Sequence, residues 1–374
     1  LSLPRTGGWA KAAPLRFLDN LLPDNDRTRR RMAFDTGATS PSVFDLLARV
    51  GADVAGGLVL SAEQVPPEPA PEGDLVPASD DEIAFRIHEL RRDPDRWIDP
   101  QARRGRYSLA GAQAKFALAR LDSDWYWSSA GLPSTHIFKP APDDLREAEI
   151  LEAATLRLAR AIGVTASRGG TIEVLGQSSY IVERFDRDTA TFPFARIHTE
   201  DFAQAMGLPR SRKYGVTAVQ AIGLLRRFDP TDSTAYAFIR QLAFNVAIGN
   251  ADAHAKNYSL FIRPHGIWLT PLYDAIPTAY WPWLDSKLAM AIGGGQRSPE
   301  IGPPHWRKLA RRTGLDPDRV TIIATTTADR VLALSPEIYA GAPAKVREQL
   351  LSTLAHANTT MTKPRRALKP DRDH

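Results

Sequence analysis

Polar residues between positions 249 and 257 have the types and spacing of a site for phosphoryl transfer. Asp252 and Asn257 lie five residues apart, and Asp274 follows an apolar stretch that has a turn at its centre. Mg²⁺ prefers oxygen ligands, keeps several waters and usually shares its coordination sphere with substrate phosphates. Asn257 and Asp274 could therefore hold magnesium, while Asp252 accepts the proton of an attacking hydroxyl.

The elements around this polar cluster favour its assembly into one site. An apolar pattern of helical period precedes it and ends at Gly249, and residues 258–262 and 267–270 have the composition of two strands of a hairpin. Pairing these strands places residue 274 opposite residue 255, close to the carboxamide of the cluster. We therefore expect the hairpin to deliver the second acidic side chain to the first.

Simpler interpretations of the cluster are available. A single Asn or Asp in a loop is more often a turn former than a ligand. Four polar groups at this spacing, followed by Tyr273 and Asp274, favour a site. His254 has no cysteine and no second histidine three or four residues away, which disfavours zinc.

A phosphate-binding element and a cation are also needed. Small residues between 108 and 115 would let backbone N–H groups approach phosphate oxygens, although the segment matches neither common glycine-rich motif and by itself is equally typical of a hairpin turn. Lys139, on a short strand, is the candidate cation, unless it is a solvated strand edge. Glu152 on the following helix is the preferred partner for it, ahead of Glu149.

The composition is that of a globular protein without disulfides. The chain has 374 residues with 48 Lys and Arg against 43 Asp and Glu, a net charge of +5, and no cysteine. These counts exclude a thiolate metal site and a cysteine nucleophile, and no apolar stretch reaches the roughly 20 residues that span a bilayer. The start lacks a signal-peptide pattern, and its first residue is Leu1 and not Met, which indicates a missing N-terminal portion.

Local patterns divide the chain into two unlike parts. We predict a helix over residues 40–51, capped by Ser40 with Phe44 on its apolar face, and a second helix that opens at Ser79 with capping-box spacing. Residues 105–185 are strand-like, with two strands around a turn within 107–121, and should form a mixed sheet with one inserted helix. Helical periodicity dominates after residue 200.

Seven ordered segments carry a resemblance to a known family. They are Phe17 to Asp24, Ser108 to Lys115, Thr135 to Lys139, Val182 to Arg187, Glu200 to Phe202 with Gly207 to Pro209, Asp252 to Asn257, and Tyr273 with Asp274. Together they resemble the HipA family, the toxin kinases of bacterial type II toxin–antitoxin modules, from about residue 10 to beyond residue 290.

The resemblance implies a fold and a division of the chain. The fold is α+β and protein-kinase-like, with a β-rich N-terminal lobe and a mostly helical C-terminal lobe. Residues 1–61 would be a HipA-type N-terminal subdomain truncated at its start, and 62–78 a proline-rich linker. Residues 79–186 would form the ATP-binding lobe, and 187–374 the helical lobe with the catalytic loop and metal site.

The resemblance also implies roles for residues of an ATP- and Mg²⁺-dependent Ser/Thr protein kinase. Asp252 would be the catalytic base, assisted by Lys139, His254 and Lys256, with Asn257 and Asp274 on magnesium. Ser108 matches a serine whose autophosphorylation switches family members off. The residues implied to bind ATP are Ala110, Gly111, Ala112, Gln113, Ala114, Lys115, Lys139, Glu183, Arg184, Phe185, His254, Asn257, Tyr273 and Asp274.

Partners follow from the same resemblance. Family kinases phosphorylate aminoacyl-tRNA synthetases and so stall translation, and a DNA-binding, HipB-like antitoxin links them to operator DNA. The opening β-rich portion of the family is short or absent here, so either the sequence is trimmed at its start or a separate small protein supplies that segment. We expect a bacterial cytoplasmic protein that does not contact a membrane.

Two other functions are compatible with parts of the sequence. A small-molecule kinase of the aminoglycoside or choline type would share the catalytic Asp and the downstream Asn and Asp, and would place phosphate on a small molecule. A catalytically silent DNA-binding co-repressor would use the basic runs at 27–31, 210–213, 307–312 and 363–366. Those runs are more simply solvated helix faces and a frayed tail.

Overall fold

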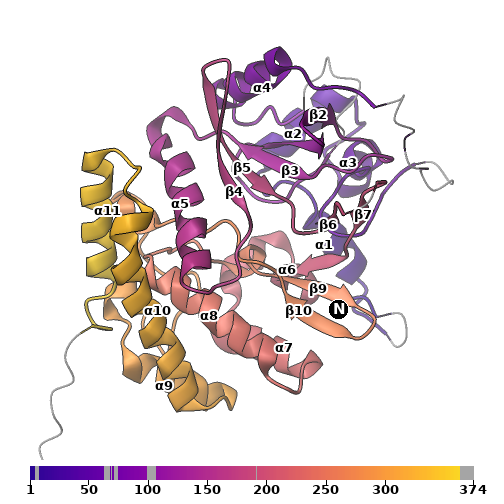
Figure 1. The fold of residues 1–374 in the computed structure, drawn as a ribbon. Helices are drawn as coiled ribbons and strands as arrows, with labels where there is room; N and C mark the ends of the chain where they lie inside the picture. The colour runs from indigo at the N-terminus through magenta and orange to yellow at the C-terminus, as the bar shows by residue number, and fades with distance from the viewer. Residues whose placement is uncertain are drawn as a thin grey trace, which may run out of the picture.

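The chain folds into two lobes, one built around a β-sheet and the other mainly helical (Figure 1). A computed structural model describes residues 1–4, 8–62, 68, 70, 75–98, 107–190 and 192–362. Most of the proline-rich linker predicted over 62–78 and the basic run at 363–366 lie outside the described residues. No helix within the described part of the chain is both long and apolar enough to cross a membrane.

Four helices precede the sheet and cover part of it. They are α1 (Ala13–Asp19), α2 (Asp26–Thr36), α3 (Val43–Val50) and α4 (Asp80–Arg92). The capping box predicted at Ser79 is confirmed, since its side chain and that of Glu82 bond each other's backbone N–H groups. The helix predicted over 40–51 begins later, at Val43, because Ser42 and not Ser40 accepts the capping hydrogen bond. Phe44, predicted to lie on the apolar face of this helix, is 65% exposed.

The sheet of the first lobe has five strands, all antiparallel, so the expected mixed sheet was wrong. The strand order is β2-β1-β3-β5-β4. Only one of the two strands expected within 107–121 forms, because residues 108–115 are a loop and Tyr107 makes an isolated bridge to Asp53. The strands are β1 (Phe116–Leu121), β2 (Asp124–Trp127), β3 (His136–Lys139), β4 (Gly169–Val174) and β5 (Gln177–Glu183), and helix α5 (Glu147–Ala161) is inserted between β3 and β4.

One hydrophobic core joins the N-terminal helices to this sheet. Phe17 of α1 and Val50 of α3 share it with Ile83 of α4 and with Phe116 and Phe138 of the sheet. The rings of Phe116 and Phe138 stack with centroids 4.7 Å apart. The helices α1 to α3 therefore pack as a wall of the first lobe.

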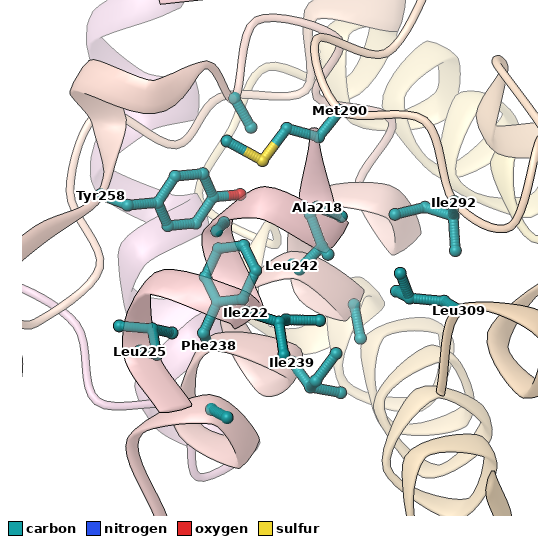
Figure 2. Close-up of a cluster of buried hydrophobic side chains, with 14 of the residues drawn as sticks. Ala218, Ile222, Leu225, Phe238, Ile239, Leu242, Tyr258, Met290, Ile292 and Leu309 are labelled. Atoms are coloured by element: carbon teal, nitrogen blue, oxygen red, sulfur yellow. The ribbon is translucent and has the colours of Figure 1, made fainter. Parts of the chain in front are cut away.

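The second lobe is helical, as predicted, and is built on α8. Figure 2 shows Phe238, Ile239 and Leu242 of α8 packed with Ile222 of α7 and Leu309 of α9. The helices are α6 (Phe202–Ala205), α7 (Ala218–Phe228), α8 (Ser233–Ala247), α9 (Pro303–Thr313), α10 (Pro317–Ile338) and α11 (Ala344–Ala357), and short 3-10 turns include η3 (Arg210–Gly215) and η4 (Ala255–Asn257).

A small sheet lies between the loop that follows α8 and Asp274 in the chain. Its strands, in the order β10-β9-β8, are β8 (Thr199–Asp201), β9 (Ser259–Arg263) and β10 (Gly266–Leu269). The hairpin has the predicted register, with Gly266 opposite Arg263. The ladder ends at Leu269, so residue 274 is not paired with residue 255 as expected. A two-residue ladder of β6 (Arg187–Asp188) and β7 (Ala195–Arg196) lies apart from it.

A buried ion network ties the N-terminal region to the end of β5. Asp53, fully buried, accepts from Arg187 at 2.8 Å and from the backbone N–H of Ser134 at 3.0 Å. Arg184 bonds Asp186 at 2.8 Å. Burial alone raises the pKa of Asp53, but the two guanidinium groups outweigh it and hold that pKa below its ordinary value.

Removal of one member should expose how much this network stabilises the fold. Asp53→Ala leaves two buried guanidinium groups short of a carboxylate, and we expect a loss of about 3–5 kcal/mol in the free energy of unfolding. Chemical denaturation measures it. Asp143→Ala, which breaks an exposed pair with Arg146, is the matched control and should change little. Equal stability of the two variants would contradict this account.

Candidate active site

A cavity of about 400 Å³ lies between the five-stranded sheet and the loop that follows α8. Most of the residues predicted to form the site line it. They are Ala110, Gly111, Ala112, Gln113, Lys115, Lys139, Glu183, Arg184, Phe185, Asp252, His254, Lys256, Asn257, Tyr273 and Asp274. Ala114 is absent from the lining and packs in the core of the first lobe instead.

The loop after α8 has a backbone fixed by hydrogen bonds, and the exposed carboxylate of Asp252 lines the cavity. Gly249 ends the helix with a φ of +70°, a conformation that suits glycine. The carbonyl of Asp252 accepts from the Asn257 side-chain NH₂ at 2.9 Å and from the backbone N–H of His254 at 2.8 Å. Since Asn257 donates through its nitrogen, its side-chain oxygen is left to accept or to bind a cation.

Lys139 joins the two lobes through two carboxylates. Its ammonium donates to Glu152 of α5 at 2.9 Å and to Asp274 at 2.7 Å. The predicted pairing of Lys139 with Glu152 is confirmed. Glu149 lies elsewhere, where it accepts from Arg91 and from the backbone N–H of Ala141, both at 2.8 Å.

The charges of this triad are strongly coupled. Burial lowers the pKa of Lys139, but Asp274 and Glu152 outweigh it and raise that pKa above its ordinary value. Burial raises the pKa of Asp274, yet Lys139 and Lys115 overcome it and hold Asp274 ionised. For Glu152, burial and the nearby charge of Asp274 prevail over Lys139 and raise the pKa. One ammonium thus bridges two carboxylates, and the pKa of Asp274 falls while that of Glu152 rises.

Asp274 is held in an uncommon backbone conformation. Its φ is +54°, in the left-handed region where few residues other than glycine lie. Strain of this kind persists where the surroundings over-determine it, and often at functional sites. The neighbouring Tyr273 fixes the segment, because its hydroxyl donates to the carbonyl of Lys256 at 2.7 Å. That contact, and not the hairpin ladder, brings Asp274 to the loop that follows α8.

The loop from 108 to 115 closes one end of the cavity. Gly111 has a φ of +108°, and a Cβ there would lie 2.8 Å from the Lys115 ammonium, so the position suits glycine. Lys115 donates to the Ala110 carbonyl at 2.8 Å, and burial with the nearby charge of Lys139 lowers its pKa to about 8. Ser108 is fully buried outside the cavity lining and donates to the carbonyl of Leu21 at 2.8 Å.

The segment from 183 to 185 crosses the edge of the cavity between the lobes. Phe185 packs against Tyr273 with ring centroids 5.2 Å apart. The guanidinium of Arg184 joins the buried Asp53 and Asp186 network, so it is unavailable to a ligand. Glu183 ends β5.

His254 and Lys256 have different environments. His254 is 5% exposed, and its Nδ1 is buried without a hydrogen-bond partner in the described structure. Burial and the Lys213 charge lower its pKa, so the neutral imidazole prevails. Lys256 does not point freely at the cavity, because its ammonium donates to Asn20 at 2.9 and 3.0 Å and to Asp201 at 3.2 Å.

Several residues that touch the site were not identified from the sequence. Asn20, Asp24 and Lys213 lie within longer segments or a basic run of the sequence, and no motif of the sequence marks Tyr214. Asp24 accepts from Lys213 at 2.8 Å and donates its backbone N–H to the Gly111 carbonyl at 2.9 Å. Contacts between segments nearly 200 positions apart leave no local pattern in the sequence.

The donor set suits a hard cation. Within the described residues, no group of three or more His, Asp or Glu side chains could hold a metal ion by itself. A cation here would need oxygens from Asn257 and Asp274, and further ligands from a nucleotide or water. That incomplete, all-oxygen set is the kind that Mg²⁺ accepts with a phosphorylated substrate.

Comparisons with known proteins agree with this site. A model of the HipA-like C-terminal domain matches residues 107–334, and one of the HipA N-terminal domain matches 1–61. The chain is 35% identical over 337 residues to the protein Y4mE of Sinorhizobium fredii, across 86% of this chain and 80% of that protein. It is 30% identical over 311 residues to the serine/threonine-protein kinase toxin HipA of Shewanella oneidensis, across 78% and 69% of the two chains.

A solved structure gives the same picture. The complex of HipA, HipB and operator DNA from Shewanella oneidensis MR-1 contains a chain that matches with a TM-score of 0.79 at 26% identity. The match covers 95% of this chain and 87% of that one. The predicted kinase-like α+β fold is thereby confirmed.

The contacts of Asn20 lead to a test that needs no activity assay. Asn20→Ala removes the side-chain bonds to Lys256 and to the carbonyls of Arg16 and Leu208. Because the buried Lys256 ammonium loses an acceptor, we expect about 1–3 kcal/mol less stability in chemical denaturation. Gln296→Ala, at an exposed amide, serves as the control. A variant as stable as the parent would show that this contact does not hold the lobes together.

Proposed function

Because the chain belongs to the HipA-like family, we propose that it is an ATP- and Mg²⁺-dependent protein kinase that phosphorylates serine or threonine. One observation carries the proposal: Lys139 of the sheet contacts both Glu152 of α5 and Asp274, which follows the β9–β10 hairpin. That arrangement, beside a loop whose Asp252 carboxylate lines the cavity, is the working geometry of a kinase cleft.

The residues divide between holding the nucleotide and moving the proton. Asp252, which is exposed at the cavity, is suited to accept the proton of the attacking hydroxyl. Asn257 and Asp274 would hold magnesium, which when bound neutralises charge on the transferred phosphoryl group. Lys139 and the loop from 110 to 115 would orient the phosphates.

The remaining contacts of the nucleotide follow from the cavity walls. We assign the adenine to the backbone from Glu183 to Phe185 and not to the Arg184 side chain, because Asp53 and Asp186 already bind that guanidinium. Neutral His254 lies on the phosphate side of the catalytic loop. Lys256 is better assigned to supporting that loop than to binding phosphate, because Asn20 and Asp201 hold its ammonium.

The biological setting of the kinase is part of the proposal. The HipA of Shewanella oneidensis that this chain resembles was solved with HipB and operator DNA. We infer a HipB-like antitoxin and, through it, operator DNA as partners, and an aminoacyl-tRNA synthetase as the substrate whose phosphorylation inhibits translation. The N-terminal region 1–61, the ATP-binding lobe 79–186 and the helical lobe 187–374 would be the functional units.

Two variants test the catalytic assignment. Asp252→Ala removes the base, and Asp274→Ala removes a magnesium ligand and a partner of Lys139. Each should lower phosphate incorporation into protein by at least about a hundred-fold, measured with labelled ATP and Mg²⁺. Asp285→Ala, at an exposed residue, is the matched control. Undiminished labelling in both site variants would refute the assignment, and label on a small molecule instead of protein would favour the aminoglycoside-type kinase.

Autophosphorylation at Ser108 is proposed as the regulatory step. The hydroxyl is buried against Leu21, so the loop must leave its present position before it can react, and a dianionic phosphate could not return to that place. Incubation with ATP and Mg²⁺ should add the mass of one phosphate to the intact chain. Ser108→Ala should abolish the gain, whereas Ser123→Ala, in an exposed turn, should not. An unchanged gain in Ser108→Ala would place the modification elsewhere.

A further inference from the structure

Asp252 has a well-held backbone but a side chain with one described partner. Its carbonyl and its N–H are bonded within the loop, the latter to Asn250 at 3.1 Å. The carboxylate, by contrast, extends into the cavity mouth. There the hydroxyl of Tyr214 donates to its Oδ1 at 2.7 Å.

Tyr214 is itself positioned from three directions. It lies on the turn η3, which the Lys213–Asp24 ion pair at 2.8 Å ties to the N-terminal region. Its ring meets His254 edge to face with centroids 4.9 Å apart, and the Lys213 ammonium lies 5.2 Å from its centroid. The ring is nevertheless 55% exposed, so it does not serve as a core residue.

We propose that Tyr214 is a positioning residue for the base of the reaction, holding one oxygen of Asp252 so that the other faces the substrate hydroxyl. The inference rests on the proposed kinase function. A carboxylate on an exposed loop can adopt several rotamers, of which few are productive for proton transfer. A donor bound to Oδ1 selects among them before the substrate arrives.

The phenol is suited to remain a donor during turnover. Burial and the adjacent Asp252 raise the pKa of Tyr214 above its ordinary value, so the hydroxyl stays protonated at neutral pH. It therefore does not compete with Asp252 as a base. Tyr214 also lines the same cavity as Asp252.

Two substitutions separate the hydroxyl from the ring. Tyr214→Phe keeps the contact with His254 and removes the donor, whereas Tyr214→Ala removes both. The rate of phosphate incorporation into the full chain is measured over a range of ATP concentrations. We expect both variants to slow the maximal rate by about ten- to a hundred-fold, with half-saturating ATP unchanged. Tyr126→Phe, on β2 outside the cavity, is the matched control.

Each outcome decides the question. If only Tyr214→Ala is slow, the ring contributes through its packing and the hydroxyl does not position Asp252. The proposal is then wrong. If Tyr214→Phe also slows the residual rate of Asp252→Asn by the same factor, Tyr214 does not act through Asp252. A parent protein that incorporates no phosphate would overturn the kinase function and this inference together, whereas an active parent with an equally active Tyr214→Phe would overturn the inference alone.

Discussion

The ammonium of Lys139 is the constraint on which the rest of the site depends. It comes from the sheet of one lobe, contacts Glu152 of the helix inserted in that sheet, and reaches Asp274, which follows the hairpin of the other lobe. The distance between the lobes and the position of α5 are therefore set by one buried group. A cation bound at Asp274 would compete with Lys139 for that carboxylate. The Lys139 ammonium would then keep Glu152 as its partner and be able to bind phosphate oxygens.

A second connection runs through residues 20–24, between α1 and α2. Asn20 accepts from Lys256 of the loop after α8, Leu21 from Ser108, and Asp24 bonds both the Gly111 carbonyl and Lys213. The loop from 108 to 115, the loop after α8 and the turn η3 thus share one support. Displacement of that segment would alter all three loops together, because each hydrogen bond ends on the same short stretch of chain.

Patterns confined to one element could be predicted from the sequence, and contacts between distant elements mostly could not. The capping box at Ser79 and the register of the 259–269 hairpin follow from neighbouring residues, and both were correct. The predicted start of the helix at 40–51 was wrong because Ser40 and Ser42 are both residues that can cap a helix, and Ser42 is the one that does. Tyr214 and Asn20 were missed because their partners lie 38 and 236 positions away. Such partners are defined only by the folded arrangement.

The shared core of the first lobe has a consequence for how this protein could be divided or exchanged. Phe17, Val50 and Val54 pack with the same sheet residues as Ile83 of α4, and Asp53 anchors the strand end by charge. A cut near residue 61 would expose the apolar face that these residues cover. It would also leave the buried guanidinium groups of Arg184 and Arg187 without the Asp53 carboxylate. Transplanting residues 1–61 from one relative to another would therefore require matched changes in the sheet, and natural variation on the two sides of that boundary should be correlated.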